Sequence, residues 1–492
     1  MPSRQEMFTM SETFLLINGS LCPASNGATF VRHDYVANSV ATIAAAATVE
    51  DAQRAVNAAA EAFASWSRSG PDFRRSLLLE AARELLGLSE ELTDAMARET
   101  GATRDWAAFN IKLGASVLRE AASLTTAVRG ETIPSDTPGC FSMSIRQAAG
   151  VVLGIAPWNA PIILGVRAIA TALACGNTVL LKASEACPRT HSLIGSAFQR
   201  AGFPDGVVNV LTNAPADASA IVNALIDAPA VRRVNFTGST RVGRLIAERC
   251  GRHLKPALLE LGGKAPLIVL DDADLDAAVD AAVFGAFMNQ GQICMSTERV
   301  IVTPAIAEPF IERLARRAAA LRSGDPRQNE TPLGTVIDVD AADRVRALVA
   351  DALANGAVRV AGEDGQGVFM PANVIDHVTP HMRLHAQESF GPVVSVIRAR
   401  DQDDAIRIAN DTEYGLAAAV FTRDLSNALT VARLIRSGIC HINGATVHDE
   451  PQAPFGGLGS SGYGRFGGEA GVAEFTDLRW VTLQSQPRHY PI

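Results

Sequence analysis

Several patterns that mark common protein classes are missing from this sequence. The seven cysteines are scattered and contain no CxxC motif, which favours a reducing compartment over a disulfide framework. The nine histidines form no histidine-rich tract, so no dedicated metal site is expected. A formal net charge of −8 argues against nucleic acid or an anionic membrane as the main partner. These absences leave a cytoplasmic globular protein as the expectation.

Signals for export or membrane insertion are also missing. Residues 1–19 mix acidic and basic side chains and contain no apolar core before a small-residue cleavage site, so no signal peptide is expected. Residues 148–166 are nearly all apolar, but two prolines and an asparagine interrupt them and Arg167 follows. Such a stretch predicts a buried strand and loop better than a helix that spans a membrane.

The organisation of the chain follows from its length and its apolar rhythm. A chain of 492 residues exceeds what one hydrophobic core normally holds, so two or three domains are expected. Residues 51–100 carry apolar side chains at helical spacing. After Thr178 short apolar strands alternate with amphipathic helices, and a second such block runs from about Ala265 to Gly444. This alternation predicts parallel, doubly wound sheets, but no low-complexity linker marks the domain boundaries.

Two further segments fit neither block. FSMSIRQ, within residues 130–147, and LRWVTLQSQ, near the C-terminus, have the alternating side chains of strands. Strands outside the main domains commonly pair with each other or with another subunit. We therefore expect an oligomerisation arm, with surface hairpins as the alternative.

Six short motifs occur in one order along the chain. They are PWN at 157–159, KASE at 182–185, FTGSTRVG at 236–243, LELGGK at 259–264, GQIC at 291–294 and ESFGPV at 388–393. Together they resemble the aldehyde dehydrogenase superfamily, from about Phe14 to the C-terminus. Each motif alone is weak evidence, but six in this order and at these spacings are highly specific. Within the superfamily the chain is most similar to bacterial enzymes that oxidise aromatic aldehydes.

The resemblance implies an α/β fold in three parts. A doubly wound parallel-sheet cofactor domain would comprise residues 1–129 and 149–262, a second α/β catalytic domain 263–459, and a small β oligomerisation arm 130–148 and 460–492. It also implies a homodimer or homotetramer that oxidises an aromatic aldehyde to its carboxylic acid with NAD. Vanillin is the expected substrate, with salicylaldehyde or benzaldehyde as alternatives.

Cys294 is the candidate nucleophile. It ends the segment NQGQIC, whose glycines and polar residues predict an open loop. A thiolate suits aldehyde oxidation, because its addition makes a tetrahedral oxyanion that expels hydride and leaves a thioester. Cys175, Cys250 and Cys440 are expected instead to be small buried apolar residues.

Glu260 and Asn159 complete the predicted catalytic set. Glu260 lies in the apolar run ALLELGG, where a carboxylate is costly to bury without a task. The resemblance makes it the base that activates water for thioester hydrolysis, with a structural ion pair as the alternative. Asn159 would donate its side-chain amide to the oxyanion, with the backbone N–H of Cys294 as the second donor.

The predicted cofactor site departs from the common dinucleotide fingerprint, because no GxGxxG motif follows a predicted strand. FTGSTRVG instead sets two glycines and a serine at a strand-to-helix turn, where exposed amides favour a pyrophosphate. The resemblance assigns the adenosine ribose to Lys182 and Glu185, and Glu185 would repel a 2′-phosphate, so NAD is expected over NADP. It assigns the nicotinamide ribose to Glu388. The expected cofactor-binding residues are Trp158, Lys182, Glu185, Gly238, Ser239, Gly243, Glu388 and Phe390.

The expected substrate pocket is drawn from the neighbourhoods of the motifs. Arg167 could contact a phenol oxygen or stack on a ring, with an ion pair at a domain boundary as the alternative. Trp106 could be a plain packing residue. Residues 446–451 are expected to line the mouth, with His448 and Asp449 at its polar rim. The pocket residues are Trp106, Leu164, Arg167, Ile293, Met295 and Phe455.

These residues argue against three other functions. A dehydrogenase that passes the acyl group to coenzyme A usually lacks the glutamate found at 260. A non-catalytic relative should have lost Cys294, Glu260 or Asn159, and all three are present. An esterase would leave the cofactor residues without a purpose.

Overall fold

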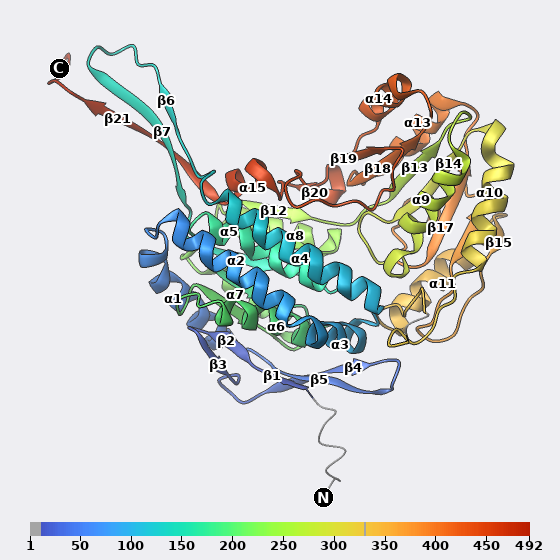
Figure 1. The fold of residues 1–492 in the computed structure, drawn as a ribbon, viewed down its shortest axis with the longest axis horizontal. Coiled ribbons are helices and arrows are strands. Elements are labelled where there is room, and N and C mark those ends of the chain that lie inside the picture. Colours follow the sequence, from blue (N-terminus) through green and yellow to red (C-terminus); the bar gives the residue numbers. More distant parts are fainter. Residues whose placement is uncertain (1–10, 329–330) are drawn as a thin grey trace, which may run out of the picture.

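Four β-sheets organise the described part of the chain, and helices cover the two larger ones (Figure 1). The computed structural model describes residues 11–328 and 331–492. Residues 1–10 lie outside the described residues. The expectation of no signal peptide rests partly on them, and the predicted cofactor domain begins with them.

The first large sheet has eight strands in the order β20-β12-β11-β8-β9-β10-β2-β3. Its five central strands, β12 to β10, run parallel, and the strands at either side are antiparallel. Among the parallel strands the chain enters the sheet at β8 and moves outward through β9 to β10. It then returns to the other side of β8 with β11 and β12, as in a doubly wound sheet. The strands are β2 (Leu15–Ile17), β3 (Ser20–Cys22), β8 (Val151–Ile155), β9 (Thr178–Lys182), β10 (Val208–Leu211), β11 (Val231–Thr237), β12 (Ala257–Glu260) and β20 (Gly462–Tyr463).

Helices bury both faces of this sheet. Along β8, Val151, Leu153 and Ile155 join the core shared with α1, α7 and α8, whereas Val152 joins the core of α2 to α6. A strand that is apolar on both faces is what a sheet covered on both sides requires. The helices are α1 (Val49–Trp66), α2 (Pro71–Gly87), α3 (Ser89–Thr100), α4 (Arg104–Leu124), α5 (Pro161–Ala174), α6 (Pro188–Arg200), α7 (Ala218–Asp227) and α8 (Thr240–Arg252).

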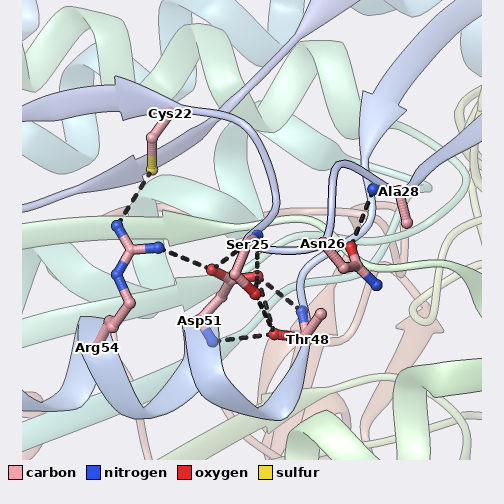
Figure 2. A network of polar contacts seen from close by, with 7 residues as sticks. All are labelled: Cys22, Ser25, Asn26, Ala28, Thr48, Asp51 and Arg54. Atoms are coloured by element: carbon pink, nitrogen blue, oxygen red, sulfur yellow. Dashed lines mark hydrogen bonds and ion pairs between the residues drawn. The ribbon is translucent and has the colours of Figure 1, made fainter.

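A small sheet, β1-β5-β4, lies beside this body (Figure 1). It contains β1 (Ser11–Thr13), β4 (Thr29–Asp34) and β5 (Ser39–Ala45). The loop before β4 is fixed to the start of α1 by the buried carboxylate of Asp51, which accepts the N–H groups of Ser25 and Thr48 (Figure 2). Arg54 pairs with Asp51 at 2.9 Å. These bonds satisfy the buried charge.

The second large sheet has the order β15-β16-β17-β14-β13-β18-β19, and all but β15 run parallel. Helices α9 and α10 cover one face, and α11, α13 and α14 cover the other. The strands are β13 (Ala265–Val269), β14 (Thr297–Val302), β15 (Val358–Ala361), β16 (Asn373–Asp376), β17 (Val393–Arg398), β18 (Ala417–Phe421) and β19 (Ile439–Ile442). The helices are α9 (Leu275–Phe287), α10 (Pro304–Ala319), α11 (Val339–Ala354), α12 (Arg383–Ala386), α13 (Gln402–Asn410) and α14 (Leu425–Leu434).

The fourth sheet projects from the body as a long arm (Figure 1). It joins β6 (Glu131–Ile133), β7 (Cys140–Ala148) and β21 (Thr476–Gln484), and α15 (Gly468–Glu474) precedes β21. All nine residues of β21 pair antiparallel with β7, from Thr476 opposite Ala148 to Gln484 opposite Cys140. The two alternating segments are therefore strands, as predicted, and of the two pairings left open the structure shows pairing with each other.

The structure confirms the predicted fold class and corrects some details. The apolar stretch 148–166 is a buried strand and loop only as far as Ala160, because α5 begins at Pro161. No helix among the described residues is both long and apolar enough to span a bilayer. The domain limits remain a prediction, and β20 pairs with β12 although residues 460–492 were expected in the arm.

Candidate active site

The candidate site lies where opposite edges of the two large sheets meet. Glu260 is the last residue of β12, at the carboxyl edge of the first sheet. Cys294 lies three residues before β14, and Glu388 lies five before β17, both at the amino edge of the second sheet. The N–H of Gly263, between β12 and β13, donates to Glu388 at 2.8 Å and so links the two edges.

Glycines allow the backbone segments around Cys294 to approach one another. A Cβ at Gly263 would lie 2.3 Å from the carbonyl oxygen of Cys294, and one at Gly291 would lie 2.1 Å from that of Gly391. Neither contact is sterically possible. The preceding turn also contains two non-glycine residues in the left-handed region, Asn289 and Gln290. This loop was expected to be open, but its residues 289–293 are buried and the cysteine is half-buried.

The Cys294 thiol lies in a setting that disfavours its charged form. Burial raises its pKa well above the usual range, and the carboxylates of Glu260, Glu388 and Asp449 act in the same direction. The guanidinium of Arg167 opposes them. The thiol is therefore neutral here at pH 7, and its activation requires a proton acceptor or an added positive charge.

Asn159 and Trp106 form a linked pair beside the cysteine loop. The Asn159 side-chain amide donates to the carbonyl of Gln292 at 2.9 Å, two residues before Cys294. The Asn159 carbonyl accepts from the indole N–H of Trp106 and from the side-chain amide of Asn289, both at 2.9 Å. Trp106 lies in the first turn of α4 and stacks on Phe109. The tryptophan thus helps to hold the amide that was predicted to bind the oxyanion.

Glu260 is a buried carboxyl group without a hydrogen-bond partner among the described residues. It is 2% exposed, and burial raises its pKa well above the usual range, although Arg167 and Arg465 favour the charged form. Among the described residues it forms no ion pair, so the alternative role, a structural ion pair, is not seen. A carboxylate with a raised pKa is a stronger base toward water.

The candidates for the adenosine end of the cofactor lie at the carboxyl edge of the first sheet. Lys182, the last residue of β9, forms an ion pair with Glu185. Glu185 also accepts from the side-chain amide of Asn213 at 3.0 Å, just beyond β10. The carboxylate is thereby held at the end of two neighbouring strands.

The glycine motif at the start of α8 has two separate physical roles. Ser239 is the N-cap and accepts from the N–H of Val242, which leaves the first turn of a 13-residue helix at the sheet edge. Gly243 is required for packing, because a Cβ there would lie 2.4 Å from the Leu261 side chain. A Cβ at Gly238 would meet the Phe236 ring at 2.4 Å. The helix N-terminus suits a phosphate group.

Glu388 and Phe390 lie on a strongly held turn. Phe390 has a φ of 47°, and its N–H donates to the buried carboxylate of Glu298, which also pairs with Lys264 at 2.7 Å. The Phe390 ring meets Trp158 edge to face at 5.6 Å. Burial raises the pKa of Glu388 to about 7.

These groups fit a dinucleotide. Two carboxylates can accept ribose hydroxyls, the N-terminus of α8 can bind a phosphate group, and a Cβ at Gly262 would lie 2.6 Å from the Glu388 carboxylate. Among the described residues, no cluster of His, Cys, Asp or Glu side chains is arranged to hold a metal ion. The four-residue spacing of His377, His381 and His385 does not build one, since only His385 lies in a helix.

Five of the six predicted pocket residues belong to the apolar core cluster against which Cys294 packs, and Arg167 is the exception. Arg167, on α5, donates to Asp449 at 2.6 Å and stacks over the Phe455 ring at 4.7 Å. The ion pair that the sequence left open is therefore present, and the guanidinium also makes an aromatic contact. Trp106, Leu164, Ile293, Met295 and Phe455 are all buried members of the cluster.

Sequence reasoning missed the buried pair Lys264–Glu298 and the role of Asn289. Glu298 accepts from the N–H of Ser389 and of Phe390, so it fixes the turn that carries Glu388. The available signal was a charge at the start of each of two apolar strands, β13 and β14. Asn289 gave no such signal, because its role depends on a left-handed backbone that brings it to Asn159.

Comparison with known proteins adds an independent finding. The model of the aldehyde dehydrogenase family matches residues 24–481. Vanillin dehydrogenase of Pseudomonas fluorescens is 58% identical over 483 residues, which cover 98% of this chain and 100% of that protein. The crystal structure of a salicylaldehyde dehydrogenase from Pseudomonas putida G7 complexed with salicylaldehyde has a TM-score of 0.97 and 48% identity, covering 98% of this chain and 100% of that one. A betaine aldehyde dehydrogenase from Staphylococcus aureus in complex with NAD+ has a TM-score of 0.92 and 31% identity, with coverages of 97% and 95%.

Proposed function

The chain belongs to the aldehyde dehydrogenase family, and from this premise we propose that it oxidises an aromatic aldehyde to its carboxylic acid with NAD. The observation that carries the proposal is the meeting of Cys294, Glu260 and Asn159 between the two large sheets, beside an apolar cluster whose Phe455 ring is covered by Arg167. Vanillin is the first candidate substrate and salicylaldehyde the second, in keeping with the relatives at 58% and 48% identity.

The proposed reaction has two halves. The Cys294 thiol gives its proton to water, and the thiolate sulfur then bonds to the aldehyde carbon. The resulting oxyanion accepts hydrogen bonds from the Asn159 side-chain amide and the Cys294 N–H. Hydride then leaves the carbon, and a thioester remains on Cys294. When bound, the oxidised nicotinamide supplies the hydride acceptor and a positive charge. In the second half Glu260 takes a proton from water, the resulting hydroxide attacks the thioester, and the C–S bond breaks to release the acid.

The preference for NAD over NADP rests on Glu185. Its carboxylate is held by Lys182 and Asn213 at the edge where the adenosine ribose is expected. A carboxylate accepts ribose hydroxyls but repels a 2′-phosphate. We expect kcat/KM to be higher with NAD than with NADP, and equal values would contradict this assignment.

The arm supports an oligomer, which we propose to be a homodimer or homotetramer in the cytoplasm. β21 is an edge strand, and its Leu478 and Trp480 are 63% and 72% exposed. Exposed apolar side chains on an unpaired edge favour association. Leu478→Glu should shift the sedimentation coefficient toward a smaller species, whereas Leu429→Glu on α14, equally an exposed leucine, should not. An unchanged coefficient in L478E would remove the arm from the interface.

A panel of purified aldehydes tests the main proposal. Vanillin, salicylaldehyde, benzaldehyde and hexanal should be compared by kcat/KM with NAD, with and without coenzyme A, and with product analysis. We expect the aromatic aldehydes to be preferred and the free acid to form in both cases. Preference for hexanal would refute the aromatic substrate, and an acyl-coenzyme A product would refute the hydrolytic role of Glu260.

A further inference from the structure

The carboxylate of Asp449 uses only one of its two oxygens within the protein. Its side chain is 9% exposed, and Oδ2 accepts from Arg167 at 2.6 Å. Oδ1 is buried and, among the described residues, has no hydrogen-bond donor. A buried carboxylate oxygen without a donor costs free energy, and such groups in folded proteins call for a partner.

Asp449 lies beside the reacting groups. It pairs at 2.6 Å with Arg167 on α5, the helix that begins two residues after Asn159. Arg167 in turn stacks on Phe455, in the apolar cluster that packs against Cys294. The Asp449 carboxylate is therefore held next to residues expected to form the substrate pocket.

The loop that carries Asp449 is fixed close to the nucleophile. Thr446 is fully buried, and its hydroxyl bonds to that of Thr297 at 2.8 Å. Thr297 begins β14, three residues after Cys294. Asp449 is thus held from two sides, by this loop and by Arg167 on α5.

We propose that Asp449 determines specificity by accepting, at Oδ1, a hydrogen bond from a hydroxyl group on the ring of the aldehyde. Arg167 then acts as a positioning residue. It holds Oδ2 of Asp449 and acts on the aromatic ring of the substrate only through Phe455, on which it stacks. This inference rests on the proposed oxidation of aromatic aldehydes. It changes the role first expected of Arg167, because the group offered to the substrate is an acceptor and not a donor.

An acceptor and a donor select different substrates. A carboxylate oxygen binds a phenolic O–H but repels the lone pairs of a methoxy group, whereas a guanidinium N–H would bind either oxygen. The wild-type enzyme should therefore prefer a hydroxybenzaldehyde over the matching methoxybenzaldehyde at one ring position. We expect a ratio of about 10- to 100-fold in kcat/KM, the range for a hydrogen bond to a charged group. The ortho, meta and para pairs identify the position.

Asp449→Asn gives the sharpest variant. Arg167 can only donate, so it should hold the Asn carbonyl oxygen and turn the amide N–H toward the position of Oδ1. That N–H serves a hydroxyl and a methoxy oxygen alike, so the ratio of kcat/KM between the hydroxy and methoxy substrates should fall to near one, whatever the change in the absolute rates. Glu450→Gln is the matched control, since Glu450 is a neighbouring carboxylate that is 50% exposed and paired with His448. It should keep the wild-type ratio.

The outcomes separate this inference from the proposed function. If benzaldehydes are oxidised but no hydroxy/methoxy pair differs in the wild type, the role of Asp449 is wrong and the proposed function stands. If D449N lowers all substrates by the same factor, Asp449 is structural and the inference also fails. If no aromatic aldehyde is oxidised, the proposed function itself fails. If D449N does not fold, the hydroxy- and methoxybenzaldehyde pairs measured with the wild-type enzyme still test the proposal. A kcat/KM ratio near one at every ring position would overturn it.

Discussion

The two large sheets contribute opposite edges to the same site. The first supplies its carboxyl edge, where ligands of doubly wound sheets normally bind: Glu260 ends β12 and Ser239 follows β11. The second supplies its amino edge, because Cys294 and Glu388 precede β14 and β17. None of these four residues lies at the carboxyl edge of the second sheet. The fold rule locates half of the site, and the other half depends on the close approach of glycine-containing loops.

The comparison assigns covalent chemistry to the amino edge, and Cys294→Ala should have the largest effect. Without the nucleophile neither half of the reaction can proceed, so kcat should fall by at least about 10⁴-fold while NAD still binds. Steady-state rates and a fluorescence titration with NADH measure the two. Cys440→Ala, at a half-buried cysteine on β19, is the control and should stay active. Substantial acid formation by C294A would contradict the assignment of the covalent chemistry to the amino edge of the second sheet.

The carboxyl edge should be needed only for the second half of the reaction. In Glu260→Gln the thioester should form but hydrolyse slowly, because the amide cannot take a proton from water. Steady-state turnover should fall about 10²- to 10⁴-fold. Stopped-flow absorbance should record a burst of NADH of about one equivalent per active site, then a stall. Normal turnover in E260Q, or a stall without a burst, would contradict the assignment of Glu260 to thioester hydrolysis alone.

A substitution of Asn159 tests the contribution of the loop that follows β8 in the first sheet and contacts the Cys294 loop. Asn159→Ala should lower kcat about 10²- to 10³-fold, as expected for the loss of one oxyanion donor. Trp106→Phe keeps a ring but loses the N–H that bonds to the Asn159 carbonyl, so its loss should be only a few-fold. If W106F were as damaging as N159A, the tryptophan would act on the substrate directly.

Glu388 should give the smallest effect, and one that depends on pH. Its pKa is raised to about 7 by burial, so the carboxylate form dominates only above that value. A carboxylate accepts ribose hydroxyls better than a neutral acid, so KM for NAD should fall several-fold as the pH rises from about 6 to 8. In Glu388→Gln this pH dependence should vanish. If it persists unchanged in E388Q, another group titrates.

Much of the fold could be predicted, because the apolar rhythm of β8 to β13 reports burial on both faces of a sheet. The catalytic residues could be found by resemblance, and the physical reason for their glycines became visible only in space. Gly263 is needed against the Cys294 carbonyl and Gly243 against Leu261, contacts between segments that sequence spacing does not encode. The Arg167–Asp449 pair links residues 282 positions apart, so the sequence could leave an ion pair of Arg167 open as an alternative but could not name its partner.

The most direct test of the account is to identify the residue that carries the acyl group. E260Q should be mixed with NAD and vanillin, quenched with acid during the stall, digested and analysed by mass spectrometry. The account predicts one acyl group, bound as a thioester to the peptide that contains Cys294, and its loss on treatment with hydroxylamine. An acyl group on any of the other six cysteines, or NADH release without any adduct, would contradict the assignment of Cys294 as the nucleophile.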